Sequence, residues 1–251
     1  DSSTIAALVR TQAGSRLCTF GIGFAEAAFD ETRHQERMSA YLGTEHRAMR
    51  CTAADLGAAF PAVVWHCETP MLRTAPAPMY LLSRLVDDAG YRVVLTGEGA
   101  DEILGGYDIY KETAIRRFWA RRPEARWRAL LLRRLYPYVA ALTSESDPYL
   151  QGFFGRGLTD TADPYYSHRL RWNNTARCAR FLSADLRADL AGYDPLAELD
   201  AALPADFARW SSLARAQYLE ITIFMSEYLL SSQGDRMTMA HGVEGRYPVG
   251  S

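Results

Sequence analysis

The amino-acid sequence lacks several features that would place it in a specialised class of protein. Its four cysteines are widely spaced and form no CxxC pair, so neither a zinc site nor a dense disulfide framework is predicted. No run of about 18 apolar residues occurs, and no basic segment precedes an apolar one at the N-terminus, which predicts neither a membrane span nor a signal peptide. These absences are typical of a cytoplasmic protein with reduced thiols.

Neither sign of charge is in excess. The formal net charge is −2 over 251 residues, so bulk charge indicates no nucleic-acid or membrane partner. With 48% hydrophobic and 23% charged side chains, the chain is expected to be globular with a large core.

The first half of the chain alternates helical and strand-like segments. Such alternation predicts a parallel sheet with crossover helices, and after Tyr110 long helical patterns replace the strand signals, notably over 111–135 and 207–230. We therefore predict one domain over 1–251, with a doubly wound, mostly parallel α/β part over 1–110 and a mainly helical part over 111–251. Helices are predicted at 2–11, 32–42, from the Thr52 and Asp55 capping box and from Pro76 to about Gly90, and strands at 17–22, 45–51 and 93–95.

One loop concentrates the chemistry of the sequence. In RVVLTGEGADEILGGY, at 92–107, a predicted buried strand runs into glycines that allow close backbone approach and into the acids Glu98, Asp101 and Glu102. The carboxyl ends of strands in open α/β sheets are where ligands bind. Carboxylates hold phosphates through Mg²⁺, so the loop predicts a metal-nucleotide site.

Three segments, in this order, carry a resemblance to a known family. DSSTIAAL at 1–8, LTGEGADEILGGY at 95–107 and SSQGDRMTMAHGVEGRYP at 231–248 resemble the synthetase domain of glutamine-hydrolysing asparagine synthetases. The resemblance implies an adenine nucleotide alpha hydrolase-like fold. It also implies that ATP, with Mg²⁺, adenylates the β-carboxylate of L-aspartate and releases pyrophosphate. Ammonia then attacks β-aspartyl-AMP, and in the intact protein it comes from glutamine through an N-terminal glutaminase domain that this chain does not contain.

The resemblance assigns roles to particular residues. Asp1 and Ser2 match the end of the SGGxDS pyrophosphate loop, with Asp1 helping to hold Mg²⁺. Ile22 matches a residue that lies against adenine, and Thr96 and Gly97 match residues that touch the nucleotide. For Asp1 and Ser2 the residues alone favour a plain helix cap, and for Ile22 they indicate an ordinary buried strand.

The remaining matches surround the reacting centre. Glu98 matches a carboxylate that helps to form the acyl-adenylate or handles protons, and Asp101 matches a second Mg²⁺ and pyrophosphate ligand. Asp235 is a further pyrophosphate or Mg²⁺ contact. Glu102 either caps the following helix or faces the amino-acid substrate, and Arg73 is either an anchor for the aspartate α-carboxylate or an exposed structural residue.

Two departures from the family pattern lead to an expectation about the chain. The SGG of the pyrophosphate loop is absent, and Lys111, the single lysine, matches no family motif, although the family implies a lysine that stabilises the adenylation transition state. We expect the chain to be part of a longer synthetase and to be inactive alone.

Three rival hypotheses stay open. The first is an adenylating amide ligase with another acceptor, such as a β-lactam-forming or peptide-cyclising enzyme, and the second is a non-catalytic nucleotide-binding module. The third is RNA binding by the arginine-rich segment 116–134, which also contains Trp119 and Trp127, although a solvated helix face is favoured there and no nucleic-acid partner is predicted. A homodimer is compatible with the sequence.

Overall fold

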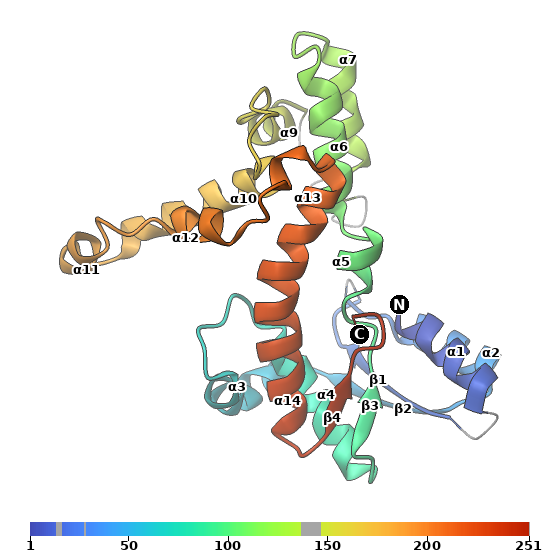
Figure 1. Cartoon of the computed structure of the whole chain (residues 1–251). Helices are drawn as coiled ribbons and strands as arrows, with labels where there is room; N and C mark the ends of the chain where they lie inside the picture. Colours follow the sequence, from blue (N-terminus) through green and yellow to red (C-terminus); the bar gives the residue numbers. More distant parts are fainter. Residues whose placement is uncertain (14–16, 28, 137–146, 251) are drawn as a thin grey trace. The chain divides into compact units, whose positions relative to one another are not determined.

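The computed structural model describes residues 1–13, 17–27, 29–136 and 147–250. These residues fall into two compact units, which are coloured along the chain in Figure 1. The first unit combines Asp1–Leu104 with Glu220–Ser251, and the second comprises Gly105–Leu219. The C-terminal segment therefore belongs with the N-terminal segment, an arrangement that a linear division of the sequence does not anticipate.

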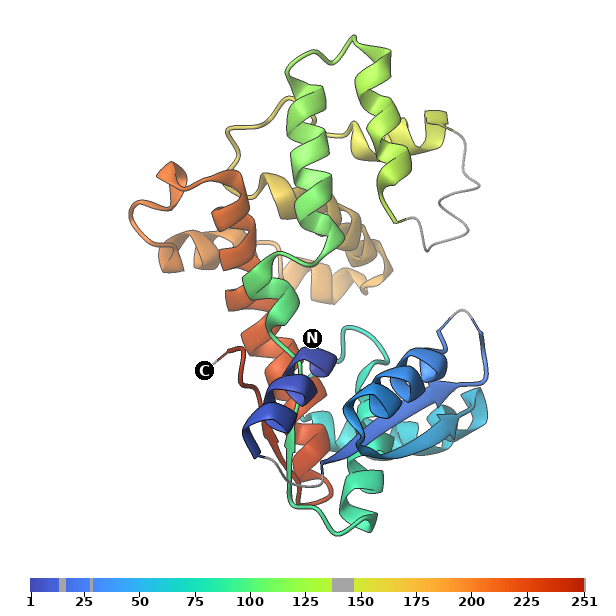
Figure 2. The same cartoon turned by 90° about the vertical axis from the view of Figure 1, so that its right-hand side faces the viewer.

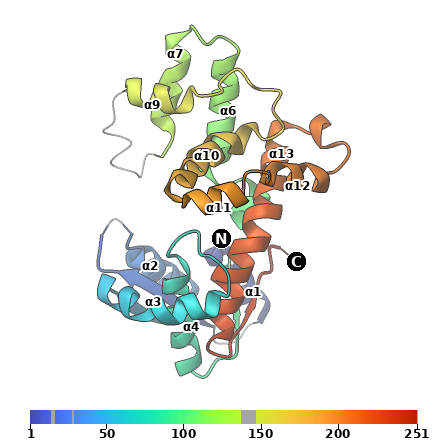
Figure 3. The same cartoon turned by 90° about the vertical axis from the view of Figure 1, so that its left-hand side faces the viewer.

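The first unit has the layered arrangement of an α/β protein. Its strands β1 and β2 form a pair with α2 on one face and α3 and α4 on the other (Figures 2 and 3). The elements of this unit, in chain order, are α1 Ser2–Ala13, β1 Cys18–Phe24, α2 Thr32–Leu42, β2 Glu45–Cys51, α3 Ala53–Cys67, α4 Pro76–Asp88, β3 Val93–Leu95, α5 Ala100–Leu104, the π-helix η4 Glu220–Asp235, α14 Arg236–Met239 and β4 Glu244–Arg246.

The strand pairing is parallel, as predicted, but one continuous doubly wound sheet is not described. Strand β1 pairs with β2 from Cys18 opposite Glu45 onward, and β3 pairs with β4 from Val93 opposite Glu244 onward. Among the described residues these are two separate two-stranded sheets. The prediction that β3 is a buried strand is wrong, because it has only three residues and its Val93 and Leu95 side chains are 43% and 41% exposed.

Local signals in the sequence set several element boundaries. The Thr52 side chain accepts the Asp55 N–H at 3.2 Å and the Asp55 carboxylate accepts the Thr52 N–H at 2.9 Å, which confirms the predicted capping box. Gly43 ends α2 with φ +64°, a conformation that disfavours residues with a Cβ. Helix α2 and strand β2 have the predicted bounds.

The C-terminal segment of the first unit holds its elements together. Met237 of α14 is fully buried against Val63 and Cys67 of α3 and Ala77 of α4. Strand β4 follows this helix and pairs with β3. The prediction that no strand occurs after Tyr110 is therefore wrong, because β4 is fixed by a partner some 150 residues earlier rather than by a local apolar pattern.

The second unit is helical. The predicted long helix over 111–135 is interrupted near Pro123, which has no N–H to continue a helix. Trp119, Leu132, Phe154 and Leu170 belong to its largest apolar cluster. No helix in the described ranges has the length and apolar character needed to cross a membrane. The elements are α6 Asp108–Ala120, α7 Arg126–Ala129, η1 Leu130–Arg134, α9 Asp147–Phe154, α10 Tyr166–Ala176, η2 Arg177–Phe181, α11 Ala184–Asp189, α12 Pro195–Ala202, η3 Phe207–Arg209 and α13 Ser212–Leu219.

The arginine-rich segment 116–134 is only partly the solvated face that was predicted. Arg116 and Trp119 are buried, with 2% and 7% of their surfaces exposed. Arg117 donates to the Thr161 carbonyl at 2.9 Å and Arg128 to the Phe118 carbonyl at 2.7 Å. These arginines support the backbone, so they are not available as part of a continuous basic stripe.

Candidate functional site

Residues 96–102, called the acidic loop below, follow β3 and run into the first turn of α5 in the first unit. The Thr96 N–H donates to the Arg246 carbonyl at 3.0 Å, which extends the β3–β4 pairing to the start of the loop. Ala100 then begins α5, so Asp101 and Glu102 lie in its first turn, where acids are favourable. The predicted acids are thus fixed by a strand on one side and a helix on the other.

Two glycines allow the close approaches that the sequence predicts. A Cβ on Gly97 would lie 2.5 Å from the Ser2 backbone nitrogen and 2.9 Å from the Asp1 Cβ. The start of α1 therefore packs directly on the loop. Gly99 has φ +92°, and a Cβ there would lie 3.2 Å from the Met225 sulfur. Asp1, Ser2 and Gly97, which are distant in sequence, therefore lie together in the structure.

Glu98 is the electrostatically perturbed group of this loop. Burial raises the pKa of its carboxyl, and the negative charges of Glu102 and Asp101 act in the same direction, whereas the Arg73 guanidinium opposes them. Glu102 itself is only 1% exposed. A half-buried carboxyl beside two other acids holds a proton more readily than an exposed glutamate does. Two of the predicted acids and the predicted arginine therefore act on Glu98.

Arg73 is held by aromatic residues. Its guanidinium lies 4.8 Å from the ring centroid of Phe224 and 5.3 Å from that of Tyr228, both in η4. These cation–π contacts direct the Arg73 charge toward the acidic loop, where it acts on Glu98. The sequence did not single out Phe224 or Tyr228, because aromatic residues in a helical pattern are usually core residues.

Asp235 is hydrogen-bonded to Tyr247, another residue that the sequence analysis did not select. The Tyr247 hydroxyl donates to the Asp235 carboxylate at 3.0 Å. A Cβ on Gly234 would lie 2.4 Å, and one on Gly245 2.9 Å, from the same hydroxyl oxygen, so both glycines make room for the phenol. Burial raises the pKa of Tyr247, and the charges of Asp235 and Glu98 raise it further. Gly234, next to Asp235, and Gly245, two residues before Tyr247, are the signal that could have indicated this contact.

A serine and a histidine anchor the segment that carries Asp235. The Ser83 Oγ of α4 lies 2.6 Å from the Met237 carbonyl oxygen and 2.8 Å from the His241 Nδ1. Since a carbonyl only accepts, Ser83 donates its proton to a carbonyl and His241 Nδ1 donates to Ser83. Burial lowers the pKa of His241, which favours this neutral form. His241 thus helps to anchor this segment through Ser83.

Other predicted residues have different surroundings. Ile22 is half-buried in β1, and its carbonyl accepts from the Gln35 side chain at 3.1 Å; no described contact joins Ile22 to the acidic loop. Glu244 and Arg246 form an exposed ion pair at 2.8 Å. Lys111 lies in the second unit and pairs with Asp108 at 2.9 Å.

The carboxylates near the loop offer hard oxygen ligands, but no ready-made cage. Among residues 1–13, 17–27, 29–136 and 147–250, no group of three or more histidines, cysteines, aspartates or glutamates is arranged to hold a metal ion. Mg²⁺ in nucleotide sites usually takes one or two carboxylates together with phosphate oxygens and waters. A site of that type needs no cluster of three protein ligands.

Comparisons with known proteins agree with this geometry. The asparagine synthase family model matches residues 1–249. A protein of Mycobacterium tuberculosis that bears the provisional name of a glutamine-hydrolysing asparagine synthetase is 30% identical, over 99% of this chain and 36% of its own length. Asparagine synthetase 1 of Bacillus subtilis is 27% identical, over 99% of the chain and 37% of its own length.

A fungal relative has a different name. Amidase chry2 of Gibberella zeae is 25% identical over 87% of this chain and 33% of its own length. The chain spans little more than a third of the length of these relatives. The family match extends over nearly every residue and includes the three segments that meet around Gly97 and Tyr247. The chain belongs to the asparagine synthase family, whose members use ATP.

Proposed function

We propose that the intact protein is an ATP-dependent amide ligase that converts L-aspartate to L-asparagine through β-aspartyl-AMP, with ammonia derived from glutamine. AMP and pyrophosphate are the other products. The proposal applies to the whole protein, since this chain corresponds to about a third of its relatives. The glutaminase activity is assigned to residues outside the chain.

One observation carries the proposal. The start of α1, the acidic loop and the Asp235–Tyr247 contact meet within a single unit, although they come from the beginning, the middle and the end of the sequence. Adenylation needs a phosphate cradle, carboxylates for a cation and a polar site for the acceptor in one place. We assign the parts of that set to residues of these segments and to Arg73, as set out below.

The nucleotide side of the site is proposed at the start of α1. Backbone N–H groups at a helix N-terminus favour anions, so Ser2 together with Thr96 and Gly97 is suited to contact pyrophosphate. Asp1 and Asp101 would hold Mg²⁺, which neutralises phosphate charge when bound. Ile22 is proposed to lie against adenine, and Asp235 to contact pyrophosphate.

The acceptor side is proposed around Glu98. Its carboxyl has a raised pKa, so it is suited to exchange a proton with the attacking ammonia once the β-carboxylate is activated. Arg73, which acts on Glu98, is proposed to bind the α-carboxylate of the acceptor. Glu102 is proposed to orient this region from its buried position in α5.

A second adenylating function has an observation in its favour. Relatives at 25% and 26% identity are named as amidases, and identities of about 30% do not fix the acceptor carboxylate. The rival is thus an enzyme with the same nucleotide chemistry and another acceptor or nucleophile. A non-catalytic nucleotide-binding module is the rival outside the enzymes.

The experiment separates these functions. The intact protein is incubated with ATP, Mg²⁺ and ammonia, and AMP release is measured with L-aspartate and with other carboxylates. Stimulation by L-aspartate with matching asparagine formation is expected, and Glu98→Gln should abolish it while Glu244→Gln, at an exposed pair, should not. Stimulation by another carboxylate alone would favour the rival ligase, and no AMP release would favour the non-catalytic module.

A further inference from the structure

The second unit contains a cavity that is lined by none of the residues assigned to the candidate site. Its volume is about 430 Å³, and all the residues that line it come from Gly105–Leu219. It lies between the end of α9, the turn that follows it, α6 and α10. A volume of this size suits a small molecule. The proposed adenylation chemistry uses none of its residues.

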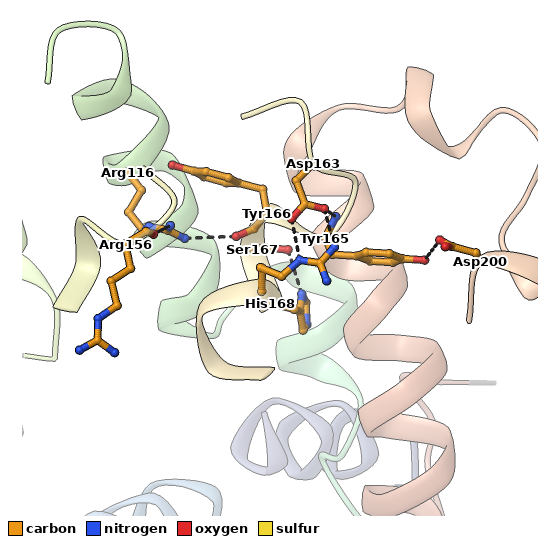
Figure 4. A network of polar contacts seen from close by, with 9 residues as sticks. Arg116, Arg156, Asp163, Tyr165, Tyr166, Ser167, His168 and Asp200 are labelled. Atoms are coloured by element: carbon orange, nitrogen blue, oxygen red, sulfur yellow. Dashed lines mark hydrogen bonds and ion pairs between the residues drawn. The ribbon is translucent and has the colours of Figure 1, made fainter. Parts of the chain in front are cut away.

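A buried arginine forms part of its wall. Arg116 is 2% exposed and donates to the carbonyl oxygens of Phe154, Tyr166 and Arg156 at 3.0, 3.1 and 2.8 Å. Its guanidinium also lies 4.4 Å from the Tyr166 ring centroid (Figure 4). In the part of the chain that the structure describes, no carboxylate pairs with Arg116. Its position is therefore fixed by backbone carbonyls rather than by an ion pair.

Two further arginines of the lining are exposed. Arg156 extends away from the other side chains drawn in Figure 4, and its recorded ring contact is with Phe153, at 5.9 Å. Arg177, at the end of α10, has no ion pair among the described residues. By contrast, Arg169 is paired with Asp163 at 2.8 Å. The guanidinia of Arg156 and Arg177 are therefore available to a ligand.

The lining has a net positive charge. Four arginines, at 116, 156, 169 and 177, stand against two aspartates, at 160 and 163, which gives +2. Asn173 and Asn174 add amide donors, and Tyr166 and Leu170 add apolar surface. Guanidinium groups bind the oxygens of carboxylates and phosphates bidentately. A ligand with two negative charges matches both the charge and the donors of this cavity.

We propose that this cavity binds a small dianion, either a phosphoryl group or a dicarboxylate. Phosphoryl groups and dicarboxylates both present anionic oxygens to the arginines. A concave site of this kind suits a small molecule better than an RNA, because RNA binding draws on an extended basic surface. Arg117 and Arg128 of the neighbouring segment are occupied by backbone carbonyls.

Isothermal titration calorimetry on the full chain tests the proposal. Inorganic phosphate and succinate are titrated at constant ionic strength and about pH 8, where phosphate is mainly a dianion, with acetate as the monoanionic control. Arg156→Gln and Arg177→Gln remove exposed charges, so folding should be unaffected. Arg187→Gln, an exposed arginine of α11 outside the lining, is the matched control.

We expect one phosphate or one succinate to bind per chain, more tightly than acetate. Arg156→Gln and Arg177→Gln should each weaken binding by about tenfold, the loss typical of a charge-assisted hydrogen bond, and Arg187→Gln should not. The dianion that binds more tightly identifies the ligand class. No saturable binding, or binding that survives both substitutions, overturns the proposal. The proposal is also overturned if a single-stranded RNA binds through Arg156 while neither phosphate nor succinate binds.

Discussion

Gly97→Ala is the substitution that tests the packing of α1 on the acidic loop. The added Cβ would lie 2.5 Å from the Ser2 backbone nitrogen and 3.0 Å from the Asp1 carbonyl carbon. Backbone atoms cannot swing aside as a flexible side chain does, so α1 or the loop must shift. Overpacking of this kind costs about 1–3 kcal/mol. We expect the free energy of unfolding to fall by that amount and ATP binding to weaken.

The assay is urea unfolding of the wild-type protein, of Gly97→Ala and of a control variant, Gly57→Ala. Gly57→Ala adds the same methyl group inside α3 with no heavy atom within 4 Å of the new Cβ, and replacing a helical glycine with alanine stabilises by about 0.5–1 kcal/mol. The two variants should therefore shift the midpoint in opposite directions at an unchanged slope. Equal stability of Gly97→Ala and the wild-type protein would refute the contact between α1 and the loop.

Three further predictions concern single side chains. Glu98→Gln should stabilise the protein more at pH 7 than at pH 4. The folded-state pKa of Glu98 is raised, so the wild type loses stability as the pH rises through that pKa. Urea unfolding at both pH values measures the effect, and the same change in unfolding free energy at pH 4 and pH 7 would show that Glu98 is unperturbed. Tyr247→Phe should cost about 1 kcal/mol of unfolding free energy, because it removes the hydrogen bond to Asp235. Tyr193→Phe, whose ring and partner Glu198 are both exposed, should cost less than about 0.5 kcal/mol. Equal losses in the two variants would contradict the contact between Tyr247 and Asp235. Ser83→Ala should cost about 1–3 kcal/mol because buried partners lose their hydrogen bonds, and an effect no larger than that of the exposed Ser226→Ala would be evidence against the anchor.

Local physics made part of the fold predictable. The Thr52–Asp55 capping box and the Gly43 helix end depend on residues within four positions of one another, so the sequence contains all the information that they need. Strand β3 has the predicted bounds, but its exposure and the presence of β4 were not predicted. The structure of both strands depends on pairing between Val93 and Glu244, which no local pattern records.

In the candidate site, too, some features were predicted from the sequence and others were not. The motifs placed Asp1 and Ser2 in the same site as the acidic loop, but the close approach of both residues to Gly97 was not predicted. Tyr247 and the aromatic support of Arg73 were not expected, since both are created by tertiary packing. The prediction of a solvated face was wrong for Arg116, which is buried. Its guanidinium donates to carbonyls some 40 residues later in the chain, and no local pattern records those partners.

The most direct test of the proposed function is the stoichiometry of AMP and asparagine formed by the intact protein with ATP, Mg²⁺, L-aspartate and ammonia. The account predicts one AMP for each asparagine, dependence on L-aspartate, and loss of both products in Glu98→Gln. AMP formation that is independent of L-aspartate, or asparagine formation that persists in Glu98→Gln, would contradict it.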